Sequence, residues 1–218
     1  MKTRVTSLGL VSSGLLLFSL VLSGCAGSSS PYQEELSGRN PGLVSRLEDG
    51  RTGFVIRESD PLDDDMNKLF ERGVSALESN DYEAAADIFR RISEATPHRT
   101  APYINLAIAF IRSDRDGQAE EPLKKALELV AGHPLASHEY GLLLRRAGRF
   151  EEARTVYEKS LNRFPEYFPL RKNLGVLCDL YLNDLKCAKR EYGLFLEAQP
   201  EDEQVKLWLV EVQGRLAR

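Results

Sequence analysis

Apolar residues in the C-terminal part of the chain recur at separations of three to five, with charged residues between them. Leu69, Val74 and Leu77 follow this spacing in one segment, and Ile88 and Ile92 follow it in the next. An α-helix has 3.6 residues per turn, so this spacing places the apolar side chains on one face. The pattern predicts a succession of amphipathic helices.

The helical pattern is itself repeated, with a period of 34 residues. Each block has a small residue, a second small residue 12 positions later, and a large apolar residue 4 positions after that. A fixed period of this length is typical of solenoid architectures, in which each unit packs on its neighbours. The three sets are Gly73, Ala85 and Phe89; Ala107, Ala119 and Leu123; and Gly141, Ala153 and Tyr157.

These blocks resemble the tetratricopeptide repeat (TPR), a helix-turn-helix unit of about 34 residues. The resemblance implies an all-α, right-handed solenoid, in which the small residues let the two helices of a repeat approach closely. Pro97 and Pro165 stand where the second helix should end. We expect four repeats and a C-terminal helix, which makes nine helices. The expected boundaries are 66–99, 100–133, 134–167 and 168–200 for the repeats and 201–218 for the capping helix.

Two parts of this repeat array depart from the pattern. In the fourth block, Ala188 and Pro200 come one residue late, and we expect the turn at 182–184 to absorb the extra residue. In the second, Pro122 and the lack of a proline at position 131 predict a second helix that starts irregularly and runs on to 132–134.

The last helix has apolar residues on one side and charges on the other, which predicts the polar-faced cap that a solenoid needs at its end. The apolar residues are Val205, Trp208, Leu209, Val212 and Leu216.

The first residues of the chain are laid out as a secretory signal peptide. Lys2 and Arg4 precede an apolar run from Leu8 to Leu22, and small residues follow it. Serines and a glycine interrupt the run, so a membrane-spanning helix, which needs about 20 apolar residues, is the weaker interpretation. We therefore expect residues 1–24 to be removed.

The end of this segment, Leu22-Ser23-Gly24-Cys25, resembles the bacterial lipobox. The resemblance implies that Cys25 carries lipid, including palmitate, and anchors the protein to a membrane. Ala26 stands where retention in the inner membrane requires Asp, so the resemblance implies the periplasmic face of the outer membrane. The alternative is that Cys25 is only a small residue near an ordinary cleavage site.

Residues 25–65 form an acidic linker whose composition buries little apolar surface and predicts disorder over most of its length. The exception is the run from Phe54 to Ile56, which favours an extended, strand-like segment. This run either docks on the protein's own solenoid, which we favour, or serves as a docking strand for a partner. The net charge of the chain is -4, which argues against nucleic acid as a partner.

Residues suited to catalysis or metal binding do not cluster. His98, His133 and His138 include no pair four residues apart, the spacing that puts two metal ligands on one helical face. Phosphate-loop, nucleophile-elbow and Cys-x-x-Cys motifs are absent from the sequence. We therefore expect no enzyme activity, no cofactor and no metal. Cys178 and Cys187 are predicted to form a disulfide in an oxidising compartment, or else to be two small core residues.

The resemblance to TPR proteins also implies a binding surface. The first helix of each repeat should line a concave groove that takes a partner protein, although its apolar residues could instead serve interhelix packing. The mixture of apolar and polar side chains suits a protein interface. The expected groove residues are Phe70, Glu71, Val74, Ile104, Asn105, Ile108, Arg112, His138, Glu139, Leu142, Arg145, Lys172, Asn173, Val176 and Asp179.

The whole sequence is similar to lipoproteins that combine a signal peptide, an acylated cysteine and TPR units. The leading hypothesis is an envelope assembly scaffold resembling the pilotins of type IV pili, which would escort or anchor a secretin. A second is an adaptor that docks peptidoglycan hydrolases or proteases at the outer membrane. A regulatory subunit of an envelope enzyme, or an enzyme whose site is not visible in the sequence, represents another class.

Overall fold

The computed structural model describes residues 62–218 and two short strands, β1 (Leu43–Arg46) and β2 (Phe54–Arg57). The strands pair in antiparallel fashion, with Leu43 opposite Arg57 and Arg46 opposite Phe54. The extended segment predicted around Phe54 is thus β2, whereas β1 was not predicted. The predicted signal peptide, the predicted lipid attachment at Cys25 and most of the predicted linker lie outside the described residues.

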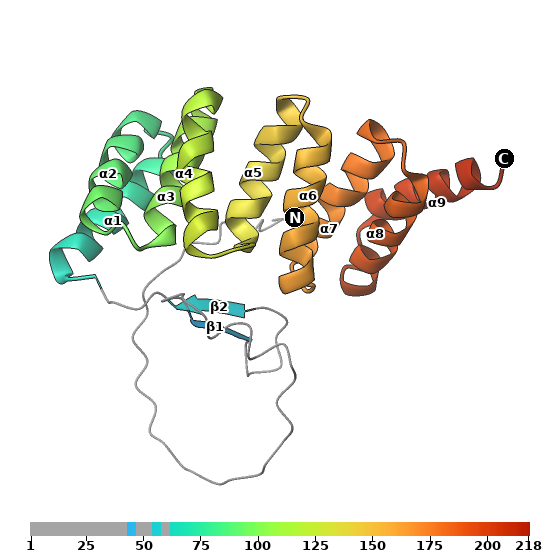
Figure 1. Cartoon of the computed structure of the whole chain (residues 1–218), viewed down its shortest axis with the longest axis horizontal. Coiled ribbons are helices and arrows are strands. Elements are labelled where there is room, and N and C mark those ends of the chain that lie inside the picture. Colours follow the sequence, from blue (N-terminus) through green and yellow to red (C-terminus); the bar gives the residue numbers. More distant parts are fainter. Residues whose placement is uncertain (1–42, 47–53, 58–61) are drawn as a thin grey trace, which may run out of the picture.

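The rest of the described chain is a row of antiparallel α-helices (Figure 1). Within the described residues there are nine, as expected, and they form four hairpins and a final helix. The predicted all-α solenoid of helix pairs is therefore confirmed for residues 62–218. The hairpins are α1 (Asp64–Glu78) with α2 (Tyr82–Ala95), α3 (Thr100–Arg112) with α4 (Asp116–Leu129), α5 (Pro134–Arg146) with α6 (Phe150–Arg163), and α7 (Phe168–Val176) with α8 (Leu185–Ala198), followed by α9 (Glu203–Leu216).

The turn inside each hairpin has the same three-residue length and the same backbone geometry. Its middle residue is left-handed, with φ of 63° at Asn80, 58° at Asp114, 74° at Gly148 and 50° at Asn183. Asn, Asp and Gly adopt this conformation more readily than other residues do. The local sequence therefore fixes where each first helix ends.

A small residue in each first helix receives a large side chain from the second helix. A Cβ atom added at Gly141 would lie 2.0 Å from the Tyr157 ring, and one added at Gly175 would lie 2.5 Å from the Tyr192 ring. Both rings are buried, with at most 1% of either residue exposed. The small residues predicted from the repeat pattern therefore set how closely the paired helices approach.

The extra residue of the fourth repeat lies in the helix and not in the turn. A π-helical segment, η2 (Leu177–Tyr181), continues α7, and the turn that follows at 182–184 has the ordinary three residues. A π-helix closes its hydrogen bonds one residue further along the chain, so it accommodates an insertion without lengthening the turn. The expectation that the turn absorbs the insertion was wrong.

Two further expectations were also wrong, one about the bounds of the second helix of repeat two and one about the outer face of the last helix. α4 begins after a regular turn, tolerates Pro122 in its interior and ends at Leu129. α9 buries Val205 and Val212, but its outer face is not polar, because Leu207 and Val210 are 70% and 65% exposed. Amphipathic spacing correctly placed Val205, Trp208, Leu209 and Val212 against the core. It was wrong for Leu216, which is 39% exposed, and it did not reveal which other apolar residues remain outside.

Candidate partner-binding face

The predicted binding residues belong to the first helices of the hairpins, α1, α3, α5 and α7, and to η2, which continues α7, but some of them form the core. Phe70 is buried and packs edge-on against Phe89, with ring centroids 5.4 Å apart. Ile104 is 1% exposed. Their assignment to a partner-binding groove was wrong, because these side chains fill the space between neighbouring helices.

Two other predicted groove residues are occupied by contacts with α9. The Lys172 ammonium lies 2.8 Å from the Asp202 carboxylate and 5.4 Å from the Trp208 ring centroid. Asp179 is buried and accepts a hydrogen bond from Arg215. Both were misassigned as free binding residues, because α9 packs on the C-terminal end of the solenoid and neutralises them.

The remaining predicted residues stay accessible and lie mainly on α3 and α5. Arg112 and Glu71 are exposed, and the others are half-buried. Val74, Ile108 and Val176 also pack against the core, whereas Leu142 is not among the core-packed residues. The half-buried residues are Val74, Asn105, Ile108, His138, Glu139, Leu142, Arg145, Asn173 and Val176.

An aromatic and apolar cluster that sequence reasoning missed lies at the end of this face. Tyr181 is 43% exposed and Leu180 is 67% exposed, both within η2. The Tyr181 ring contacts Phe150 at 4.8 Å between centroids, and the Arg145 guanidinium lies 5.6 Å from its centroid. Arg and Tyr are enriched in protein interfaces. The late arrival of Ala188 was the sequence signal that this helix is irregular.

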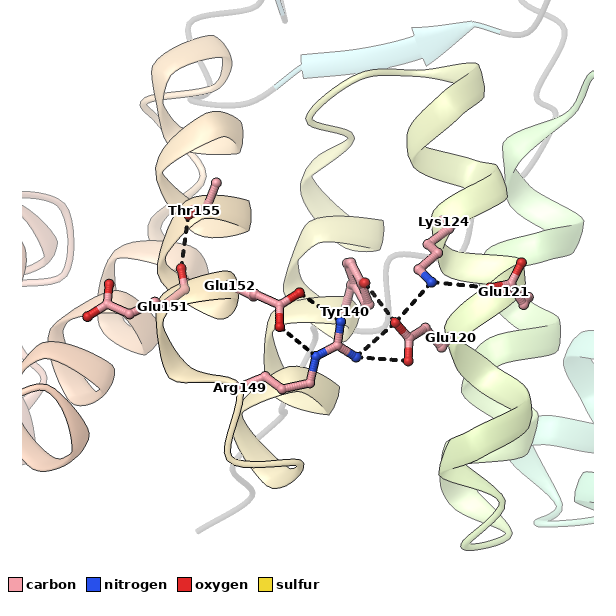
Figure 2. A network of polar contacts seen from close by, with 8 residues as sticks. All are labelled: Glu120, Glu121, Lys124, Tyr140, Arg149, Glu151, Glu152 and Thr155. Atoms are coloured by element: carbon pink, nitrogen blue, oxygen red, sulfur yellow. Dashed lines mark hydrogen bonds and ion pairs between the residues drawn. The ribbon is translucent and has the colours of Figure 1, made fainter.

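A network of ion pairs fixes the orientation of repeat three on repeat two (Figure 2). Arg149 donates to both carboxylate oxygens of Glu120, at 2.9 and 3.0 Å, and also to Glu152 at 2.7 Å. Tyr140 donates to Glu120 at 3.0 Å, and Lys124 lies 3.1 Å from it. Hydrogen bonds from Arg149 above all lower the pKa of Glu120 to about 2. The network joins α4 of the second repeat to α5 and α6 of the third.

His133 occupies the junction between the same two repeats. It is buried, and its Nδ1 accepts a hydrogen bond from the backbone N–H of Ala136 at 3.4 Å, which caps α5. Burial lowers the pKa of His133 to about 4, so the ring is neutral at physiological pH. His133 is therefore a structural residue, which agrees with the lack of metal-ligand spacing in the sequence.

The predicted bridge between Cys178 and Cys187 is present in the structure, with both sulfurs buried. It ties η2 to the first turn of α8. Across residues 62–218 no group of three or more His, Cys, Asp or Glu side chains is arranged to hold a metal ion. In the same region no helix is long and apolar enough to span a membrane.

Comparison with known proteins agrees with this helical-repeat architecture. Two profiles described as tetratricopeptide repeat match residues 76–138 and 134–177. The small glutamine-rich TPR-containing protein 2 of Mycosarcoma maydis is 28% identical over 118 residues, which cover 53% of this chain and 34% of that protein. The chain thus spans about a third of the length of this curated relative.

Two solved bacterial structures are similar in fold. MamA from Desulfovibrio magneticus RS-1 has a TM-score of 0.62 at 18% identity, covering 72% of this chain and 88% of that one. The structure titled as pilF of Pseudomonas aeruginosa has a TM-score of 0.63 at 22% identity, covering 71% and 70%. Fold and profiles together define a solenoid protein of paired helices. Residues 76–177 of the chain are built of tetratricopeptide repeats.

Proposed function

We propose that the protein is an outer-membrane lipoprotein of the periplasmic side that acts as a non-catalytic scaffold for envelope proteins. The observation that supports the scaffold is the accessible face of α3 and α5, which mixes apolar and polar side chains. The lipobox-like run ending at Cys25 supports the anchor. Three acyl chains would make that attachment effectively stable, since each buried methylene contributes about 0.8 kcal/mol.

Within this class, we favour a role in pilus or secretin biogenesis. The fold similarity to pilF supports it. The lipobox-like run ahead of the repeats, an order that resembles the pilotins of type IV pili, also supports it. The second candidate is an adaptor for peptidoglycan hydrolases or proteases. The same accessible face serves either partner, so the two candidates differ only in the protein captured.

The anchor is tested by labelled palmitate incorporation into the wild type and the Cys25→Ser variant. We expect label only in the wild type, and recovery of the wild type with outer membranes. Equal labelling of both proteins, or a wild type found in the soluble periplasmic fraction, would contradict the anchor.

The binding face is tested by the double change Asn105→Ala with Leu142→Glu. Leu142 does not pack on the core, so a charge there should disturb binding more than folding. Partners are first identified by purification from cross-linked envelopes, and their capture is then compared between variants.

The matched control is Glu94→Ala with Lys159→Ala, two exposed residues of the second helices. Capture should fall for the first pair and remain for the control. If a folded face variant captures the partner normally and the control does not, binding uses the opposite face.

A further inference from the structure

The C-terminal end of the solenoid has an outer face that nothing in the described chain covers. Every earlier first helix packs against a second helix of its own hairpin, but α9 has no such partner within residues 62–218. Val210 stands eight residues into α9, where α3, α5 and α7 have Ala107, Gly141 and Gly175. Those three are buried, whereas Val210 is exposed. A solenoid end is expected to be polar, so an apolar one indicates a covered surface.

The two most exposed apolar residues of α9, Leu207 and Val210, lie in one line along the helix with Gly214, whereas Leu216, which is 39% exposed, lies on the other side. Leu207, Val210 and Gly214 are separated by three and four residues, the spacing of the core positions in a coiled coil. Val205 and Val212 are buried, which places this line on the opposite, outward side. A Cβ atom added at Gly214 would meet nothing within 4 Å, so a second helix can approach the backbone there.

Charges beside the line determine which helix fits it. Lys206 precedes Leu207 on one flank, and Glu211 follows Val210 on the other. In a parallel pair of identical helices, the residue directly before a core position such as Leu207 lies beside the residue that is five positions further along the other helix. Lys206 of each copy would then face Glu211 of the other, which gives two ion pairs, each between a lysine and a glutamate. An antiparallel two-fold pair would instead bring each flank against the same flank of the other copy.

We propose that α9 pairs in parallel with α9 of a second copy of this chain, through Leu207, Val210 and Gly214. Lys206 is at present 2.7 Å from Glu203 of its own helix. That contact is solvent-exposed, and exposed ion pairs contribute little, so the ammonium is able to turn towards the second copy. The line spans only three core positions, and the pairing is therefore weak and dependent on concentration.

The symmetry of this pair is compatible with a single membrane surface. A two-fold axis parallel to α9 places equivalent residues of the two copies at equal heights along that axis. Both N-terminal ends therefore lie at the same height and can reach one membrane. Pairing does not rest on the proposed anchor, but an anchor would raise the effective concentration of the two helices.

Cysteine cross-linking of the full chain tests the geometry. Leu207→Cys and Val210→Cys are each made in the full-length protein, which is purified and oxidised mildly at several protein concentrations, with the wild type as the background for native thiols. A parallel pair places both positions opposite themselves, so each variant should give a cross-linked dimer. An antiparallel pair can place at most one of them on its axis. Glu197→Cys, on the exposed side of α8, is the control and should remain monomeric.

Charge reversal tests the specificity of the pair. Lys206→Glu and Glu211→Lys should each lower the cross-linking yield of Val210→Cys by about threefold, because each reversal turns two weak attractions into two weak repulsions, and the two reversals combined should restore it. Circular dichroism of each variant checks that α9 remains helical. The proposal is overturned if neither Leu207→Cys nor Val210→Cys gives a dimer, if only one does, or if Val210→Cys cross-links to another protein instead. It is also overturned if both single reversals leave the yield unchanged.

Discussion

Replacing Gly141 by alanine should destabilise the protein, although the same change in a helix is normally favourable. Alanine in a helix interior is more stable than glycine by about 1 kcal/mol. At Gly141, however, the added Cβ would lie 2.0 Å from Cε1 and 2.3 Å from Cζ of Tyr157. Carbon atoms in contact are normally about 3.5–4.0 Å apart, so α5 and α6 would have to separate by roughly 1.5 Å.

The size of the effect follows from the burial of the ring. Tyr157 is fully buried, so it cannot turn into solvent to relieve the contact. Overpacking a well-packed core costs about 1–3 kcal/mol, and a contact this short belongs at the upper end. After the helix preference is subtracted, we expect Gly141→Ala to lower the free energy of unfolding by about 2 kcal/mol. For a domain of this size that corresponds to a melting temperature lower by about 4–8 °C.

Urea and thermal unfolding followed by far-UV circular dichroism measure this change. Gly193→Ala in α8 is the matched control, because an added Cβ there meets nothing within 4 Å. It should stabilise the protein by about 0.5–1 kcal/mol. If Gly141→Ala is as stable as the wild type while the control behaves as expected, close packing at this position does not limit the fold.

The second repeat supplies a compensating change. There Ala107 stands where the third repeat has Gly141, and Leu123 stands where it has Tyr157. The double variant Gly141→Ala with Tyr157→Leu recreates that pair. Alanine at 141 should therefore be tolerated beside leucine, so the double variant should be at least as stable as Tyr157→Leu alone. A double variant less stable than Tyr157→Leu would show that the ring is not the source of the strain.

Three further predictions concern charge and covalent structure. Because the pKa of Glu120 is lowered in the folded protein, its charge stabilises the fold above about pH 4.5, and this stabilisation is lost as the pH falls towards 2. The melting temperature of the wild type should therefore exceed that of Glu120→Gln by less and less across that window. A difference that does not change with pH would contradict this. Because the pKa of buried His133 is lowered in the folded protein, the free energy of unfolding should fall as the pH drops from about 6.5 to 4. In His133→Asn the free energy of unfolding should depend less on pH over this range. The same dependence in both proteins would exclude His133 as the cause. The double change Cys178→Ser with Cys187→Ser should lower the free energy of unfolding by somewhat less than about 3 kcal/mol, because the loop that the disulfide closes is short. Amide hydrogen exchange should rise first in α8 and α9, since a solenoid is stabilised mainly by contacts between neighbouring repeats. An equal rise in α1 and α2 would contradict this.

Long-period patterns determined the fold from the sequence alone. The spacing of small and large residues, such as Gly141, Ala153 and Tyr157, fixed the helix pairs because close packing admits few residue types there. The left-handed turn residues are also local features, since Asn, Asp and Gly favour that geometry without help from the rest of the molecule. The pairing of Cys178 with Cys187 followed because they are the two cysteines left once Cys25 is assigned to lipid, and because both lie in the fourth repeat.

The binding face and the C-terminal end were decided only by the tertiary structure. Ile104 and Asn105 are neighbours in sequence, yet one is buried and the other is half-exposed, because burial depends on the adjacent helices. From the sequence, Lys172 is predicted to be a free groove residue, whereas in the structure its ammonium forms an ion pair with Asp202 at the start of α9. From the sequence, Val210 is one more residue of an amphipathic helix, whereas the structure shows that no helix of residues 62–218 covers it. Local patterns specify the direction of each side chain around its own helix, whereas its neighbours are supplied by segments distant in the chain.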